Sequence, residues 1–213
     1  WQRANAIAAR HRANYVATQH DEGALAAVLF SQLPEHSDLV ASSSMPIRDV
    51  DTFFEKTTRD IRIFCNRGTN GIVGVVSTAF GLQYASQRDT YLLIGDLAFL
   101  HDSNGLIASR YEPSELTIVI MNNDGGGIFS YLPQSTVDAH YEQLFGTPTA
   151  LGFEHLAAMY DAEYANVTTT EDFTTVLQTP KNKAIRIIEV MTDRAENVTT
   201  HRTLWQAINE ELD

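Results

Sequence analysis

The feature that most constrains this chain is a pair of short apolar runs, each ending in a polar cluster that contains glycine. The first run, Tyr91 to Ile94, stops at Gly95-Asp96, and the second, Thr117 to Met121, stops at Asn122-Asn123-Asp124 and three glycines. A segment of helical length separates the two runs. Short apolar runs that alternate with helices are typical of parallel strands in a βαβ unit. The pattern therefore predicts an α/β fold.

Further apolar segments extend this unit into a larger sheet. The other predicted strands are residues 38–43, 62–65, 164–168 and 184–190. Because helical patterns alternate with them, we expect a doubly wound, mainly parallel six-stranded sheet with helices on both faces. A long helix is predicted over residues 72–86, and residues 134–148 lack periodicity, which indicates a mobile loop or lid. We expect residues 1–37 to form a helical lead-in and residues 38–213 to form the sheet domain.

Bulk properties narrow the function classes. The chain has 213 residues, 44% of them hydrophobic, which favours a globular protein with a full core. Its formal net charge of −12 disfavours nucleic acid as a partner, because binding phosphates requires a basic face. The single cysteine, Cys65, allows no internal disulfide and suits the cytoplasm, and no apolar run is long enough to predict a membrane span. Since the sequence begins at Trp1 rather than Met, we expect it to be a piece of a longer protein.

Side chains that carry oxygen atoms follow both strands of the first unit. Asp96 comes directly after one strand and Asn123 after the other. The carboxyl ends of neighbouring parallel strands meet at one edge of a sheet, where open parallel sheets bind their ligands. Mg²⁺ is usually held by one or two carboxylates together with substrate phosphates. We therefore expect Asp96, Asn123 and the carbonyl of Gly125 to hold a divalent ion, while the glycines let a diphosphate approach the backbone.

Together these residues form a recognisable motif. Asn123 follows Asp96 by 27 positions, and Gly-Asp followed at this distance by Asn-Asn resembles the motif of thiamine-diphosphate enzymes. Within that family the chain most resembles the branch that serves menaquinone biosynthesis, and the resemblance covers most of the chain from about Asp38. The residues that select this branch are Asn66-Arg67-Gly68, Gly95-Asp96-Leu97, and Asn122 to Ser130 with Leu132-Pro133. Leu97 stands where many other family members have glycine.

The resemblance implies a cofactor and its ligands. It implies that the chain binds thiamine diphosphate with Mg²⁺ or Mn²⁺, and that the metal ligands are Asp96, Asn123 and Gly125. Ile72 matches the large apolar residue that bends the cofactor in this family. The positions implied to contact the cofactor are Ser44, Ile72, Gly95, Asp96, Leu97, Asn123, Gly125 and Gly126.

The resemblance also implies a reaction. The branch decarboxylates 2-oxoglutarate and adds the succinyl semialdehyde unit to isochorismate, which makes the enzyme a transferase. Both substrates carry carboxylates, which guanidinium groups bind in a bidentate manner. The positions implied to contact substrate are Arg48, Arg67, Ile128, Phe129 and Leu132.

One essential group is expected outside this sequence. In the resembled family an activating glutamate comes from a pyrimidine-binding domain of a second subunit. That domain and a central domain would precede Trp1, and no residue of this chain matches the glutamate. We therefore expect no catalytic residue in this chain, an inactive chain on its own, and a full-length enzyme that is a homodimer or homotetramer.

Two other functions remain open at this point. The chain could serve a thiamine-diphosphate decarboxylase or carboligase with another acceptor, similar to acetolactate synthase or benzoylformate decarboxylase. It could also be a non-catalytic domain for subunit association. Two common nucleotide-binding motifs are absent, because the chain contains neither a P-loop nor the spacing of a dinucleotide fingerprint.

Overall fold

The structure is a computed structural model that describes residues 1–66, 71–112, 114–137 and 139–212. Its centre is a six-stranded sheet in the order β2-β1-β3-β4-β6-β5, and all neighbouring strands run parallel. The strands are β1 Ser37–Ala41, β2 Ile61–Phe64, β3 Asp89–Gly95, β4 Leu116–Asn122, β5 Glu163–Val167 and β6 Ile185–Met191. The predicted doubly wound parallel sheet is thereby confirmed.

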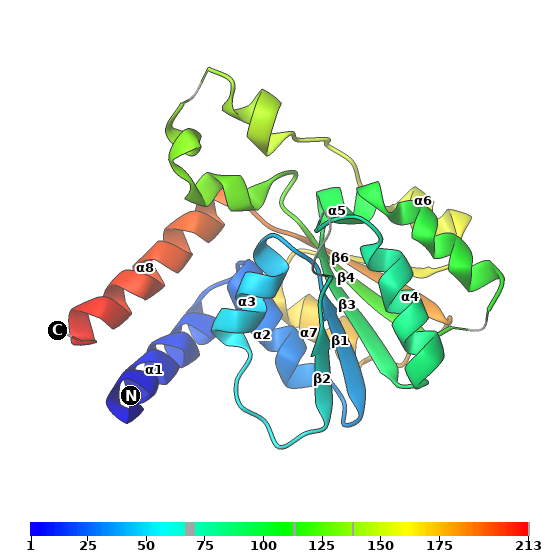
Figure 1. Ribbon diagram of the computed structural model, residues 1–213, viewed down its shortest axis with the longest axis horizontal. Helices are drawn as coiled ribbons and strands as arrows, with labels where there is room; N and C mark the ends of the chain where they lie inside the picture. The colour runs from blue at the N-terminus through cyan, green and yellow to red at the C-terminus, as the bar shows by residue number, and fades with distance from the viewer. Residues whose placement is uncertain (67–70, 113, 138, 213) are drawn as a thin grey trace.

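Helices cover both faces of the sheet (Figure 1). The α-helices are α1 Gln2–Thr18, α2 Glu22–Gln32, α3 Met45–Phe53, α4 Val75–Ser86, α5 Asp96–His101, α6 Glu154–Met159, α7 Thr170–Gln178 and α8 Arg194–Leu212. Along β3, Leu93 packs with the core beneath α2, α3 and α7, whereas Leu92 and Ile94 pack with the core beneath α4, α5 and α6. This alternation follows from the pleat of a strand that is buried on both sides.

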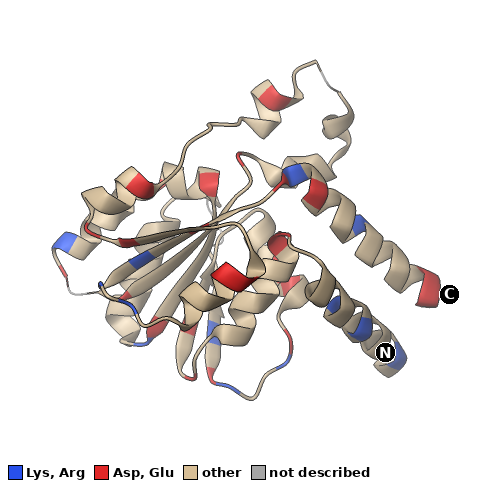
Figure 2. Cartoon of the chain, turned by 180° about the vertical axis from the view of Figure 1, so that it is seen from behind, with Lys and Arg blue, Asp and Glu red and all other residues tan. Residues whose placement is uncertain are grey.

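The first and last helices form a pair at one side of the sheet. α1 and α8 lie side by side, so the two chain ends are near one another (Figure 1). Basic residues of α1 lie beside the acidic end of α8 (Figure 2), where Arg10 forms an ion pair with Glu211 and His11 Nε2 lies 2.8 Å from Glu211 Oε2. Exposed pairs of this kind add little stability. α2 is largely buried against the sheet, so residues 1–37 share the core of the domain.

Two predicted segments differ from their expected form. The helix predicted from residue 72 begins at Val75, because Gly74 adopts a left-handed conformation with φ +70° and ends the preceding turn. The segment expected to be a loop over residues 134–148 contains short helical turns at Pro133–Thr136 and Glu142–Gly146. It is attached to the rest of the molecule, since Arg194 Nη2 donates to Glu142 Oε2 at 2.8 Å.

Candidate functional site

The two predicted metal-binding side chains lie past the ends of adjacent strands. β3 ends at Gly95 and β4 at Asn122, and the register pairs Gly95 with Met121. Asp96 and Asn123 therefore leave the sheet at the same edge. β1 and β3 are neighbours whose connections run to opposite sides of the sheet, and ligands bind at such a switch point in open α/β sheets.

Asp96 is a carboxyl group that folding removes from water. Asp96 is 3% exposed, and its Oδ2 atom has no hydrogen-bond partner among the residues that the structure describes. Burial raises the pKa of Asp96 to about 6, although the backbone amides of Leu97 and Gly125 favour the ionised form. A nearby cation would compensate for this burial. The position and the burial of the carboxyl group are thus those expected of a metal ligand.

Asn123 presents a second oxygen without a partner. Its Nδ2 atom donates to Glu22 Oε1 at 2.6 Å, while its Oδ1 atom is buried and accepts no hydrogen bond from any described residue. Leaving such an acceptor unsatisfied costs about 1–3 kcal/mol. Oxygen atoms of this kind are what Mg²⁺ coordinates. The orphaned oxygens of Asp96 and Asn123 therefore fit the predicted divalent ion.

The turn after Asn123 requires glycine. Gly125 has φ +145°, and a Cβ atom there would lie 2.2 Å from the carbonyl oxygen of Gly146. The amide of Gly126 donates to the same oxygen at 2.7 Å, and a Cβ atom at Gly126 would lie 2.3 Å from the carbonyl oxygen of Phe145. By contrast, a Cβ atom at Gly95 would meet nothing within 4 Å. The site thus combines a tightly packed turn with open space beside β3, which a diphosphate could occupy.

The other predicted cofactor contacts lie on segments around the same edge. Ser44 follows β1 and has φ +75°. Ile72 is half-buried and packs against the core beneath α4. Its neighbour Gly71 lies against the turn after β1, because a Cβ atom there would be 2.3 Å from Ser43 Oγ. Leu97 is half-buried in the first turn of α5.

Most of the predicted substrate contacts share a cavity of about 430 Å³. It is lined by Arg48, Ile128 and Leu132. Tyr131 and residues of α3 and α8, among them His201, complete the lining. Arg48 is exposed, and its Nη1 atom donates to the carbonyl oxygen of Ser44 at 2.7 Å. The cavity therefore has an apolar and aromatic wall, and its charged lining residues include Arg48 and Arg202 together with the carboxyl groups of Asp49 and Asp51.

Two predicted substrate contacts lie elsewhere. Phe129 is 36% exposed and packs against Phe145, with ring centroids 5.6 Å apart, instead of lining that cavity. It does so because Gly126 and the following residues turn the chain toward Phe145. Arg67 lies outside the residues that the structure describes. The described part of the chain contains no cluster of three His, Cys, Asp or Glu residues that could hold a metal.

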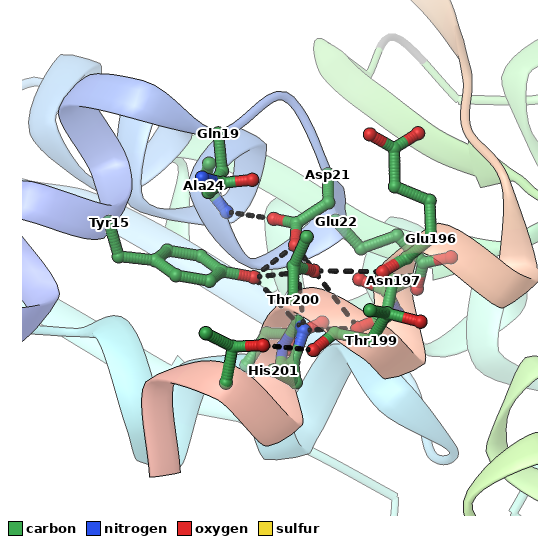
Figure 3. Close-up of polar contacts among 12 residues, drawn as sticks. Tyr15, Gln19, Asp21, Glu22, Ala24, Glu196, Asn197, Thr199, Thr200 and His201 are labelled. Carbon is green, nitrogen blue, oxygen red and sulfur yellow. Dashed lines mark hydrogen bonds and ion pairs between the residues drawn. The ribbon is translucent and has the colours of Figure 1, made fainter. Parts of the chain in front are cut away.

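Sequence reasoning missed a network of buried polar residues behind this site. Figure 3 shows Tyr15, Asp21, Thr200 and His201 converging where α1, the start of α2 and α8 meet. Tyr15 donates to Asp21, and its hydroxyl lies 3.1 Å from His201 Nδ1. No local pattern reveals such a network, because its members are far apart in the sequence and each is an ordinary helical residue by itself.

The network changes the pKa values of its members. Burial opposes the charged form of His201, but its hydrogen bonds to the carboxylates of Asp21 and Asp49 and their negative charges outweigh burial and raise the pKa to about 10. Burial and the charge of Asp49 raise the pKa of Glu22 to about 8, although the hydrogen bond from Asn123 favours its ionised form. Charged and polar groups buried in this way are costly unless they have partners, so we expect them to serve a purpose beyond packing.

Sequence comparisons place the chain in a family. Residues 52–190 match the family model described as "Thiamine pyrophosphate enzyme, C-terminal TPP binding domain". A protein of Lysinibacillus sphaericus (strain C3-41) named 2-succinyl-5-enolpyruvyl-6-hydroxy-3-cyclohexene-1-carboxylate synthase is 57% identical over 212 residues, which are 100% of this chain and 37% of that protein. A protein of the same name from Bacillus velezensis is 46% identical and covers 95% of this chain and 36% of that protein. The chain thus spans little more than a third of the length of these relatives.

Solved structures show a similar fold. The Rhodococcus jostii thiamine diphosphate-dependent 4-hydroxybenzoylformate decarboxylase has a TM-score of 0.62 at 23% identity, covering 81% of this chain and 32% of that one. The benzoylformate decarboxylase of Polynucleobacter necessarius has a TM-score of 0.63 at 17% identity, covering 83% of this chain and 34% of that one. At these identities the likeness concerns the fold alone. The described part of the chain contains no helix long and apolar enough to cross a membrane.

The resemblance inferred from the motif is confirmed by these relatives. They carry the name of the menaquinone-pathway synthase at 57% and 46% identity. The chain therefore belongs to the thiamine pyrophosphate enzyme family, in which it forms a C-terminal TPP-binding domain of the kind found in 2-succinyl-5-enolpyruvyl-6-hydroxy-3-cyclohexene-1-carboxylate synthases.

Proposed function

We propose that this chain binds thiamine diphosphate through Mg²⁺ or Mn²⁺ at the carboxyl edge of its sheet. The observation that carries the proposal is a pair of buried oxygens to which no residue in the described part of the chain donates, Asp96 Oδ2 and Asn123 Oδ1. The carbonyl of Gly125 would complete the protein's share of the coordination. Mg²⁺ keeps substrate phosphates among its ligands, so the diphosphate would supply the remaining negative oxygens.

Other residues of the chain would orient the cofactor. The backbone around Gly95, Leu97 and Gly126 would face the diphosphate, because the two glycines let phosphate oxygens approach amide groups. Ser44 and Ile72 would contact the rest of the cofactor, and Ile72 offers the apolar surface against which its rings can bend. When bound, thiamine diphosphate supplies the electron sink for removing carbon dioxide from a 2-oxoacid.

The proposed reaction is that of the relatives. The full-length enzyme would decarboxylate 2-oxoglutarate and add the succinyl semialdehyde unit to isochorismate. Arg48 and Arg67 would bind carboxylates of these acids, since guanidinium groups pair with carboxylates in two-point contacts. Ile128 and Leu132 would exclude water from the substrates, and Phe129 would contact them only after leaving Phe145. The names of the relatives favour this reaction over that of an acetolactate-synthase-like or benzoylformate-decarboxylase-like enzyme.

The proposal includes further parts of the enzyme. A glutamate from the pyrimidine-binding domain of a second subunit would activate the cofactor, so the full-length protein would be a homodimer or homotetramer. Without that domain this chain would give no turnover with 2-oxoglutarate and isochorismate. We place the enzyme in the cytoplasm, in line with a single exposed cysteine, Cys65, that has no second cysteine in the chain to pair with.

A calorimetric titration tests the proposal. The protein at its natural full length is titrated with thiamine diphosphate at increasing Mg²⁺ concentrations, and so are the variants Asp96→Ala and Asp89→Ala. Asp89 is an exposed aspartate at the other end of the same strand, so its substitution controls for the loss of one negative charge. We expect Asp96→Ala to abolish Mg²⁺-dependent binding and Asp89→Ala to preserve it.

The same titration separates this proposal from a role in subunit association alone. A non-catalytic association domain would bind no thiamine diphosphate in a Mg²⁺-dependent manner, even as the unsubstituted protein. Equal Mg²⁺ dependence in Asp96→Ala and the unsubstituted protein would place the metal elsewhere.

A further inference from the structure

An asparagine can bind a metal ion in only one of the two orientations of its side-chain amide. Its side-chain amide has an oxygen and a nitrogen of nearly the same shape, and rotating the group by half a turn exchanges them. Only the oxygen binds Mg²⁺. If the nitrogen of Asn123 faced the ion, the site would lose one ligand and gain a repulsive donor. Something in the protein must therefore hold the amide in one orientation.

Glu22 is placed to do this. Its Oε1 atom accepts a hydrogen bond from Asn123 Nδ2 at 2.6 Å, which leaves Asn123 Oδ1 buried without a partner. With Glu22 ionised, the opposite orientation would place two acceptor oxygens face to face. Gly127 leaves the amide its space, because a Cβ atom there would lie 2.6 Å from Asn123 Nδ2. Glu22 thus selects the orientation of the amide, and Gly127 leaves room for it.

Glu22 is itself held firmly. It is 1% exposed at the first residue of α2, and Thr192 Oγ1 lies 3.3 Å from the same Oε1 atom. The preceding residue, Asp21, accepts from the amide of Ala24 at 3.0 Å and caps the helix. Asp21 also accepts from Tyr15 and Thr200, which attaches the start of α2 to α1 and α8 (Figure 3). The oxygen offered to Asn123 therefore has a fixed position.

An ordinary structural reason does not account for Glu22. A glutamate in the first turn of a helix interacts favourably with the helix dipole, but it does so in water at little cost. Glu22 is buried, and burying a carboxyl group is unfavourable unless specific partners compensate. Among the residues that the structure describes, its hydrogen-bonding partners are Asn123 and Thr192. The contact with Asn123 requires only an acceptor oxygen, which a carboxyl group has in both protonation states.

We propose that Glu22 is a positioning residue for the cofactor's metal ion: it orients the Asn123 amide so that Oδ1 faces the cation. The inference rests on the proposed function, because it assumes that Asn123 binds the metal. It goes further by giving a role to a residue of α2, which lies 101 positions from Asn123 in the sequence. Glu22 acts through Asn123 and touches neither substrate nor cofactor in this proposal.

The test measures the Mg²⁺ concentration needed for half-maximal thiamine diphosphate binding, using the protein at its natural full length. The variants are Glu22→Ala, Glu22→Gln, Asn123→Ala, the double variant Glu22→Ala/Asn123→Ala, and Thr192→Val. Losing a residue that orients a metal ligand typically weakens metal affinity about 10- to 100-fold, so we expect Glu22→Ala to raise the required Mg²⁺ by that factor. Glu22→Gln keeps an acceptor and should stay within about threefold. Thr192→Val removes only the other contact to Glu22 and should also stay within about threefold.

The double variant distinguishes positioning from a general structural role. If Glu22 acts through Asn123, Glu22→Ala adds no further loss in the Asn123→Ala background, whereas a structural role adds the same loss in both backgrounds. Additive losses, a Glu22→Gln variant as weak as Glu22→Ala, or unchanged Mg²⁺ affinity in Glu22→Ala would each overturn the inference. Failure of the unsubstituted protein to bind thiamine diphosphate with Mg²⁺ would instead overturn the proposed function.

Discussion

At the scale of single residues, the site is surrounded by ionisable groups that folding has removed from water. Burial raises the pKa of Asp96 to about 6, whereas partners raise that of His201 to about 10 despite burial. The two groups differ in the partners that compensate for their burial. His201 lies between two carboxylates, with Nε2 3.3 Å from Asp49 Oδ1 and Nδ1 3.6 Å from Asp21 Oδ2. Asp96 Oδ2 has no hydrogen-bond partner among the described residues, and a bound cation would compensate for its burial.

His201 makes protein stability depend on pH in a predictable direction. Its pKa is 6.5 in an unperturbed state and about 10 in the folded protein, so the folded state binds more protons between these values. The stabilisation by His201 is therefore complete below pH 6.5 and is lost as pH rises toward 10. We expect the difference in free energy of unfolding between the unsubstituted protein and His201→Gln to be large at low pH and to shrink as pH rises.

Urea denaturation of both proteins across this pH range measures that difference. Subtracting one free energy of unfolding from the other cancels the contributions of groups that titrate alike in both proteins. A second variant in α8, outside the network, shows how much pH trend a substitution in this helix produces by itself. Thr203→Val, which removes a hydroxyl from α8 that donates to the carbonyl oxygen of Thr199, should show no comparable pH trend. A difference between the unsubstituted protein and His201→Gln that is constant with pH would contradict a raised pKa.

Some residues of the site could be predicted from sequence because the chemistry fixes their spacing. Asp96, Asn123 and Gly125 follow strands, and a divalent ion that bridges two strand ends requires oxygen ligands at those points. Glu22 could not be predicted in this way. Its partner, Asn123, lies 101 residues away, and its own surroundings in the sequence are those of any glutamate at the start of a helix.

At the scale of helices and strands, hydrophobic periodicity located the elements better than their ends. Backbone conformation decides an end, as Gly74 does for α4 with its φ of +70°. Contacts distant in sequence decide whether a loop is anchored, as Arg194 and Glu142 do for the segment before Gly146. Periodicity contains neither kind of information. At the start of α2 one residue has a local and a long-range role, because Asp21 caps the helix and also joins it to its neighbours.

This double role of Asp21 predicts an unusually large effect for a helix cap. Thr169 caps α7 by accepting from the amide of Asp172 at 3.1 Å, and it offers a control because it is exposed. Thr169→Ala should lower the free energy of unfolding by about 1 kcal/mol. Asp21→Ala should lower it by about 3 kcal/mol or more, since it also leaves buried His201 with one carboxylate fewer. Equal effects in urea denaturation would mean that the network adds nothing to the cap.

At the scale of the whole molecule, the first and last helices come together beside the candidate site. α1 and α8 pack against each other, and residues of α1, the start of α2 and α8 form the polar network beside Glu22 (Figure 3). Glu22 in turn accepts a hydrogen bond from Asn123. Alternating strands and helices predicted the parallel sheet, but the strand order and the place of the terminal helices depend on tertiary contacts. The proposed metal site thus depends on the entire domain, although its proposed ligands come from one βαβ unit.

The location of a bound divalent ion tests the account most directly. Crystals of the full-length protein grown with thiamine diphosphate and Mn²⁺ would reveal the ion by its anomalous scattering. We predict one peak in this domain, within coordination distance of Asp96 Oδ2, Asn123 Oδ1 and the carbonyl oxygen of Gly125. An ion bound with the cofactor that touches neither Asp96 nor Asn123 would contradict the account.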